Sequence, residues 1–176
     1  MAIEFFEINW TKLHPFEKAL TQPQVKEGGV YALYKLIGSS KKLLYVGKSK
    51  DFETRFCSHK NAADHLNTTN DRKKCFVSFG LISSYEKSRM SNDITPQQLK
   101  AVENFLIVAL NPIGNGDSTK KRYTSDIHAI IVNTGVVAKP LNKFMSHNPQ
   151  LLTLIGKSKT VTPVTRKRKP KGLYDF

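Results

Sequence analysis

The sequence has few of the residues that characterise secreted, zinc-binding or membrane proteins. Only two of its 176 residues are cysteines, Cys57 and Cys75, which is too few for a disulfide framework or a four-cysteine metal site. No apolar run reaches the roughly 18 residues that a membrane-spanning helix needs. We therefore expect reduced cysteines, a cytoplasmic location and no membrane partner.

The motifs of several common enzyme classes are also missing. There is no P-loop, no dinucleotide-binding glycine fingerprint and no nucleophile elbow. The histidines at 65, 128 and 147 are scattered, without cysteine or aspartate at metal-ligand spacing. Any chemistry must therefore come from another arrangement of residues.

Acidic residues are scarce relative to basic ones. The chain has 14 Asp and Glu against 28 Lys and Arg, which gives a formal charge of +14 at pH 7. The basic tail over residues 157–176 accounts for only part of this charge, so the rest of the chain is itself basic. Such a charge favours polyanions, and nucleic acid is the expected partner. A basic protein without a specific ligand is the alternative.

Two strand-like segments form the organising feature of the sequence. Residues 30–34 and 43–46 are rich in β-branched and aromatic side chains, and Gly-Ser-Ser at 38–40 lies between them. This pattern predicts a β-hairpin. The hairpin would place Tyr31 and Tyr45 side by side. Because each hydroxyl needs a partner or water, we expect the pair to line a wet cleft.

Two helices are predicted after the hairpin. The first spans about residues 52–66, and its Arg55 and His59, four residues apart, share one face; an ordinary surface Arg and His are the alternative. The second spans residues 95–110, where Thr-Pro-Gln-Gln is a capping-box start. Glu103 lies in its apolar stripe, where a carboxylate needs a cationic partner. The residues alone leave a structural ion pair and a metal ion as alternatives.

The remaining segments are expected to surround this core. Residues 75–82 predict a third strand, antiparallel to the hairpin. Residues 126–133 favour a short helix, and residues 142–155 a helical segment or a loose wrap. The polar stretch 83–95 is either a recognition loop or a solvated connector.

The order and spacing of the singled-out residues resemble the GIY-YIG nuclease family. The resemblance covers about residues 26–117, and no single motif in it is specific alone. One departure is a connector between the two tyrosines that is a few residues longer than usual, which predicts a longer hairpin tip. The matching positions are Gly29, Val30, Tyr31, Tyr45, Val46, Gly47, Arg55, His59, Glu103 and Asn115.

The resemblance implies a metal-dependent nuclease. Glu103 would hold one Mg²⁺, or Mn²⁺ in its place, and Arg55 would bind the phosphate. The two tyrosines can orient the water and the phosphate. The proton would pass either to Tyr31, the family's proposed base, or to His59, whose ordinary pKa suits neutral pH. Asn115 is expected to brace the site. The candidate catalytic residues are Tyr31, Tyr45, Arg55, His59, Glu103 and Asn115.

Basic residues around these positions are candidates for contacts with the DNA backbone, which is the main source of affinity in such complexes. The run of basic residues at 166–171 reads either as a flexible arm for phosphates or as a solvated tail. The candidate DNA-binding residues are Lys48, Lys50, Arg72, Lys73, Lys87, Arg89, Lys120, Lys121 and Arg122.

We expect an α+β fold with a small three-stranded antiparallel sheet flanked by helices. Its divisions would be a packing extension (1–25), a GIY-YIG-like catalytic domain (26–117), a C-terminal extension (118–156) and a flexible basic tail (157–176).

The expected function is a Mg²⁺-dependent DNA endonuclease of the compact restriction type, because little chain follows Asn115 for a separate DNA-binding region. A homodimer is one way for such an enzyme to cut both strands. The alternatives are a phage, plasmid, homing-type or repair nuclease, a non-catalytic nucleic-acid-binding module, and a basic structural protein.

Overall fold

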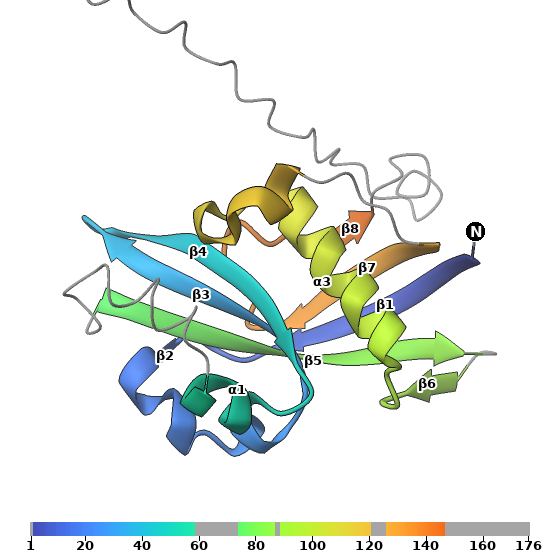
Figure 1. Ribbon diagram of the computed structural model, residues 1–176, viewed down its shortest axis with the longest axis horizontal. Helices are drawn as coiled ribbons and strands as arrows, with labels where there is room; N and C mark the ends of the chain where they lie inside the picture. The colour runs from blue at the N-terminus through green and yellow to red at the C-terminus, as the bar shows by residue number, and fades with distance from the viewer. Residues whose placement is uncertain (1, 59–73, 87–88, 121–125, 147–176) are drawn as a thin grey trace, which may run out of the picture.

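The computed structural model describes residues 2–58, 74–86, 89–120 and 126–146 (Figure 1). Its described strands form one sheet of eight, in the order β4-β3-β5-β1-β7-β8, with β2 and β6 each pairing with β5. The strands are β1 (Ala2–Trp10), β2 (His14–Pro15), β3 (Gly29–Ile37), β4 (Ser40–Ser49), β5 (Cys75–Glu86), β6 (Arg89–Ser91), β7 (Ile127–Gly135) and β8 (Phe144–Ser146).

The prediction of a small three-stranded sheet is wrong. The three expected strands, β3, β4 and β5, are present and antiparallel. However, β1 pairs with the other side of β5, and β7 then pairs in parallel with β1. The sheet is therefore mixed. Of its extra strands, β1, β2, β7 and β8 come from the two segments that we expected to lie outside the core, and β6 comes from the polar stretch 83–95, which we expected to be a loop or connector.

The N-terminal segment is a central strand of the sheet and not a cap on its surface. Phe6, Ile8 and Trp10 are buried, whereas Phe5 and Asn9 between and beside them are exposed. This alternation with a period of two is the mark of a strand with one buried face. The following 3₁₀ turns are η1 (Phe16–Thr21) and η2 (Pro23–Lys26).

The segment after residue 126 is also a strand, where a helix was predicted. Isoleucines at 127, 130 and 131 fit a helical face as well as a buried strand, so their spacing does not decide between the two. Pairing with β1 decides it, from Ala2 opposite Ile127 to Trp10 opposite Gly135. Within residues 142–155, the described part forms β8 and not a helix.

The two predicted helices begin where the sequence predicts, as α1 (Phe52–Ser58) and α3 (Pro96–Leu110). The 3₁₀ segment η4 (Ile113–Lys120), which was not predicted, follows α3. At the start of α3, the Thr95 hydroxyl accepts from the Gln98 N–H, and the Gln98 side chain accepts from the Thr95 N–H. The helix ends at Asn111, whose φ of 47° is left-handed. None of the described helices is both long enough and apolar enough to cross a membrane.

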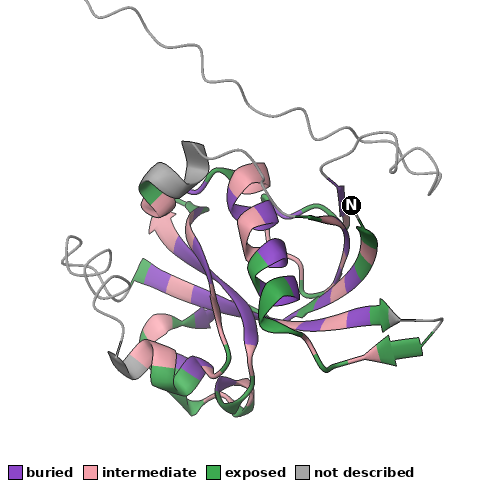
Figure 2. Cartoon of the chain, turned by 45° about the vertical axis from the view of Figure 1, so that its right-hand side comes forward, coloured by how far each residue is buried: buried purple, intermediate pink, exposed green. Residues whose placement is uncertain are grey.

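The sheet separates two apolar clusters. Since side chains alternate along a strand, Val30, Ala32 and Tyr34 pack on the side that α3 covers. Tyr31 and Leu33 point to the other side, in the cluster that contains Phe52 of α1. Figure 2 shows this alternation along the strands and the buried inner side of α3. The candidate catalytic residues therefore reach the site from both faces of the sheet.

Candidate active site

The β3–β4 hairpin brings the two motif tyrosines together, as predicted. Tyr31 lies opposite Gly47, and Leu33 lies opposite Tyr45, so the two tyrosines are diagonal neighbours on one face. Their ring centroids are 6.0 Å apart and the rings are inclined by 28°. The connector between them is almost entirely paired strand, which turns at Gly38 with a φ of +60°.

Gly47 makes room for the end of the Tyr31 side chain. A Cβ atom at this position would lie 2.6 Å from both Cζ and Oη of Tyr31 and 2.7 Å from Cε1 of Tyr45. These distances are too short for any side chain. The Tyr31 hydroxyl therefore lies over the backbone of β4, which is the last strand of the sheet on this side.

Tyr31 is fully buried, so the wet cleft that we expected is not found at this residue. The rings of Phe52 and Phe56 pack against it at centroid distances of 6.1 and 5.0 Å, whereas Tyr45 is half-buried. Burial raises the pKa of Tyr31 to about 12, although the hydrogen bond and the charge of Arg55 act in the opposite direction. The hydroxyl therefore keeps its proton at neutral pH.

Helix α1 places Arg55 against the Tyr31 hydroxyl. Asp51 caps this helix by accepting from the Glu53 N–H at 2.9 Å. One turn later, Arg55 Nε donates to Tyr31 Oη at 3.4 Å, which is long for a hydrogen bond. His59, the predicted neighbour of Arg55, lies outside the described residues, as does the expected end of the helix near residue 66.

Glu103 approaches β4 from the other face of the sheet. Its Oε2 lies 3.4 Å from Lys48 Nζ, and only 15% of its side chain is exposed. Burial raises the pKa of Glu103, while the charges and hydrogen bonds of Lys48 and the charge of Arg55 act to lower it. A lysine partner is thus present, which was one of the two alternatives for this residue.

Asn115 binds the outer edge of β4 as a neighbouring strand would. Its Nδ2 donates to the Val46 carbonyl at 2.7 Å, and its Oδ1 accepts from the Val46 N–H at 2.9 Å. Gly114 permits this approach, because a Cβ there would lie 2.8 Å from the Leu44 carbonyl oxygen. Asn115 thus satisfies the backbone of β4 at Val46, beside the Tyr31 hydroxyl.

A comparison with protein families agrees with this geometry. Residues 27–115, half of the chain, match the family model of the GIY-YIG catalytic domain. The chain belongs to the GIY-YIG family. This domain is a nuclease domain, and nucleases of the family generally use divalent metal ions. No curated protein and no solved structure matches the chain at a significant level.

Among the described residues of the candidate site, Glu103 is the carboxylate that lies beside the Tyr31 and Arg55 side chains. Among the described residues there is no group of three or more His, Cys, Asp or Glu side chains that could hold a metal. Mg²⁺ is commonly bound by one or two carboxylates, with substrate phosphates and water completing its coordination. The hard oxygen donors of Glu103 fit such an ion, provided that it binds together with a phosphate.

The predicted DNA-contact residues are only partly described. Lys48 lies on β4 and is one-third exposed, Lys50 follows this strand, and Arg89 is exposed on β6. The sequence analysis missed the pairing of Lys48 with Glu103. The sequence signal that could have suggested this pairing is a lysine beside Gly47 together with a glutamate in an apolar stripe, because each of them needs a partner. The candidates whose side chains are not described are Arg72, Lys73, Lys87, Lys120, Lys121 and Arg122.

Proposed function

We propose that this GIY-YIG protein is a Mg²⁺-dependent DNA endonuclease that cleaves at a specific sequence. The observation that supports it is the meeting of three elements at the edge of β4. Strand β3 contributes the Tyr31 hydroxyl, α1 contributes the Arg55 guanidinium, and α3 contributes the Glu103 carboxylate. Phosphodiester hydrolysis needs these kinds of groups, which are a phosphate-binding cation, an orienting hydroxyl and a metal ligand. The charge of +14 suits a polyanionic substrate.

Each side chain has a role that follows from its surroundings. Arg55 can move from its long contact with Tyr31 to a phosphate oxygen, because a hydrogen bond of 3.4 Å holds it only weakly. Tyr31, with its raised pKa of about 12, acts as a proton-bearing hydroxyl that donates to the phosphate or the attacking water. Of the two bases considered, this leaves His59 as the better acceptor of the proton.

Glu103 would hold the metal ion, with Lys48 beside it. A divalent metal bound there supplies positive charge to the phosphate and lowers the pKa of a bound water. Asn115 holds the backbone of β4 in place and takes no part in the chemistry. Tyr45 stacks on Tyr31 and fixes the direction of its ring.

The placement of the extra strands supports a compact enzyme. After Asn115, the described part of the chain forms β7 and β8, which complete the sheet. DNA contacts would then come from the catalytic domain and its loops, as in a restriction-type enzyme. One set of catalytic residues cuts one strand at a time, so double-strand cleavage would use a homodimer or two successive visits. A homing-type, phage, plasmid or repair nuclease would share the same site and differ in its products.

The Lys48–Glu103 pair favours one second candidate, a DNA-binding protein that does not cut. Lys48 gives Glu103 a cationic partner without any metal ion. A carboxylate with a purely structural role would also need such a partner. Such a protein would bind DNA with a steep salt dependence and without any effect of metal.

Cleavage of plasmid DNA distinguishes these possibilities. We expect discrete fragments from the wild type with Mg²⁺ or Mn²⁺ and none with EDTA. Glu103→Gln and Tyr31→Phe should each lower the rate by about 10²-fold or more, the usual size for loss of one group that stabilises the transition state. Lys139→Ala, which removes an exposed lysine of the turn between β7 and β8, is the control.

The products decide the finer points. A smear in place of discrete fragments would support the proposed nuclease activity and overturn the proposed sequence specificity. Binding without cleavage of DNA under any metal would overturn the nuclease and favour the second candidate.

A further inference from the structure

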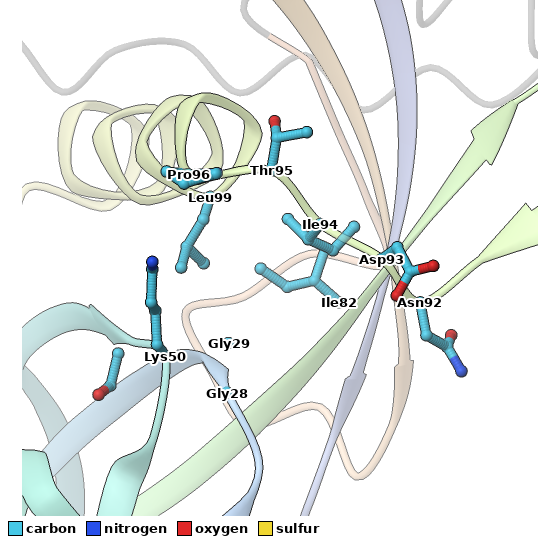
Figure 3. A pocket seen from close by; sticks show the side chains of 11 residues that line it. Gly28, Gly29, Lys50, Ile82, Asn92, Asp93, Ile94, Thr95, Pro96 and Leu99 are labelled. Atoms are coloured by element: carbon cyan, nitrogen blue, oxygen red, sulfur yellow. The ribbon is translucent and has the colours of Figure 1, made fainter.

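A cavity lies at the N-terminal end of α3, between this helix and the ends of β3 and β4 (Figure 3). Its volume of about 510 Å³ is within the range of roughly 300–1,000 Å³ that small-molecule sites occupy. Residues 92–95, which lead from β6 into α3, form its remaining side. None of the catalytic roles proposed above uses this cavity, although Lys50, a predicted DNA contact, lines it.

The cavity adjoins the candidate active site on two elements. Ser49 and Lys50 line it, and they directly follow Lys48 on the chain. Leu99 also lines it and precedes Glu103 by one turn of α3, so the two side chains are neighbours on the helix, about 6 Å apart. A group covalently joined to a phosphate at Glu103 and Arg55 can therefore reach into the cavity.

The walls of the cavity combine apolar and charged groups. Ile82, Ile94 and Leu99 form an apolar side, and in Figure 3 their side chains extend toward one another. Lys50 rises from the end of β4 toward α3, and Asp93 lies at the rim. A free phosphate would gain nothing from the apolar side and would be repelled by Asp93. A nucleotide has a flat base for the apolar side, polar base edges for the carboxylate and a phosphate for the lysine.

Hydrogen bonds fix the rim that carries Asp93. The Ser83 hydroxyl donates to Asn92 Oδ1 at 2.8 Å, and the Asp93 N–H donates to the Ser91 hydroxyl at 3.2 Å. This segment therefore joins β5 and β6 to the start of α3 in one arrangement. These bonds position the backbone that carries Asp93. An ionised carboxylate can only accept hydrogen bonds, and the exocyclic amino groups of adenine, cytosine and guanine can donate them.

We propose that this cavity binds one unpaired nucleotide of the DNA strand, next to the phosphate that is cleaved. The base packs against Ile82, Ile94 and Leu99, Lys50 contacts its phosphate, and Asp93 accepts from its amino group. The enzyme would then disfavour thymine at this one position, because the only donor on an unpaired thymine base edge, N3–H, lies between two carbonyl oxygens that the carboxylate repels. The proposal rests on the proposed nuclease function, and it adds a second point of recognition to the same site.

Fluorescence of 2-aminopurine tests the proposal without any cleavage. This base analogue is placed at each position in turn along an oligonucleotide substrate, and emission is recorded with the full-length protein in EDTA. We expect a severalfold change in emission at a single position. Lys50→Ala and Ile94→Asn should abolish this change, whereas the control Lys139→Ala should retain it. Lys50 is exposed, so its replacement leaves the core intact.

Sequencing the products of a randomised library is the second arm. Asp93→Ala should remove the bias against thymine at one position, and Asp126→Ala, at another exposed aspartate, should retain it. Equal emission at all positions, or emission unchanged in both cavity variants, would overturn the proposal even if plasmid is cleaved. The protein could also give a position-specific signal that both cavity variants abolish, and yet not cleave DNA. This result would support nucleotide binding in the cavity and overturn the proposed nuclease activity.

Discussion

At the scale of single residues, the missing side chain of Gly47 decides where the Tyr31 hydroxyl can lie. Any Cβ there would overlap the end of the Tyr31 ring, which is 2.6 Å away. The motif predicts a glycine at this position, but only the register of the hairpin explains it. Tyr31 lies directly across from Gly47, and its side chain reaches over the edge strand. Burial of the hydroxyl, and its raised pKa, follow from the rings of α1 that cover it.

Glu103→Gln is expected to remove activity without lowering stability. The folded-state pKa of Glu103 lies above its unfolded value, mainly because of burial. Its contribution to stability is therefore fully present below the unfolded pKa, about 4.3, and is lost as the pH rises through the folded pKa. Glutamine cannot ionise, and its side-chain carbonyl can still accept from the Lys48 ammonium. We expect its Tm to equal or exceed that of the wild type at pH 7.

Thermal unfolding followed by circular dichroism from pH 3 to pH 7 checks this expectation. Any advantage of Glu103→Gln should shrink as the pH falls. Glu27→Gln, at an exposed glutamate, is the matched control and should show no such trend. A Glu103→Gln protein that is clearly less stable at pH 7 would mean that the pair with Lys48 is mainly structural.

Lys48→Met is expected to strengthen metal binding in the absence of DNA. The Lys48 ammonium lies 3.4 Å from Glu103 Oε2 and competes with a metal ion for the same carboxylate. Partly exposed ion pairs are worth roughly 1 kcal/mol, so its removal should tighten Mn²⁺ binding about fivefold. Titration calorimetry measures this directly. Lys50→Met removes the same charge two residues away and should have a smaller effect. Weaker binding in Lys48→Met would show that the lysine instead helps to build the metal site.

At the scale of elements, the outer edge of β4 is completed by side chains. An exposed strand edge leaves backbone donors and acceptors without partners. Here Asn115 pairs with both polar backbone groups of Val46. The last strand is thereby held firmly at the point where the Tyr31 hydroxyl crosses it.

Asn115→Leu is expected to loosen this edge. Leucine would leave the Val46 N–H and carbonyl without their partners, which costs about 1–3 kcal/mol in a partly buried place. Urea unfolding measures the stability, and amide exchange should show faster exchange at Val46 in particular. Asn142→Leu, at an exposed asparagine, is the control. Unchanged exchange at Val46 would mean that the side-chain pairing does not hold the strand.

Sequence patterns predicted some elements well because their signals are local. The capping box and the proline fixed the start of α3, and the hairpin followed from its turn and its apolar runs. The helix predicted where β7 lies was wrong, because its isoleucines fit the period of a helix and that of a strand equally well. Pairing with β1, from the opposite end of the chain, determines that the segment is a strand. The contact between Lys48 and Glu103 could not be predicted for a similar reason, since it depends on how α3 crosses the sheet.

At the scale of the whole molecule, the two ends of the described chain build the middle and one side of the sheet. Strand β1 lies between β5 and β7, and its Phe6, Ile8 and Trp10 share an apolar cluster with α3. Gln98 of α3 also donates to Glu4 of β1 at 2.9 Å. The alternation of these apolar residues was visible in the sequence, but their central place was not, because strand order depends on contacts across the whole chain.

The fragment 27–115 contains every candidate catalytic residue, and we expect that it does not fold on its own. This fragment lacks β1. The edge of β5 that pairs with β1 would therefore be unpaired, and α3 would lose part of the surface on which it packs. Burial of one large apolar side chain is worth about 1.5–3 kcal/mol. The loss of Phe6, Ile8 and Trp10 alone is therefore comparable to the 5–15 kcal/mol that stabilises a typical domain. Circular dichroism and urea unfolding measure the outcome, with the fragment 1–146, which keeps all described strands, as the control. A cooperative transition of 27–115 near that of 1–146 would show that the matched domain is independent and that β1 only extends it.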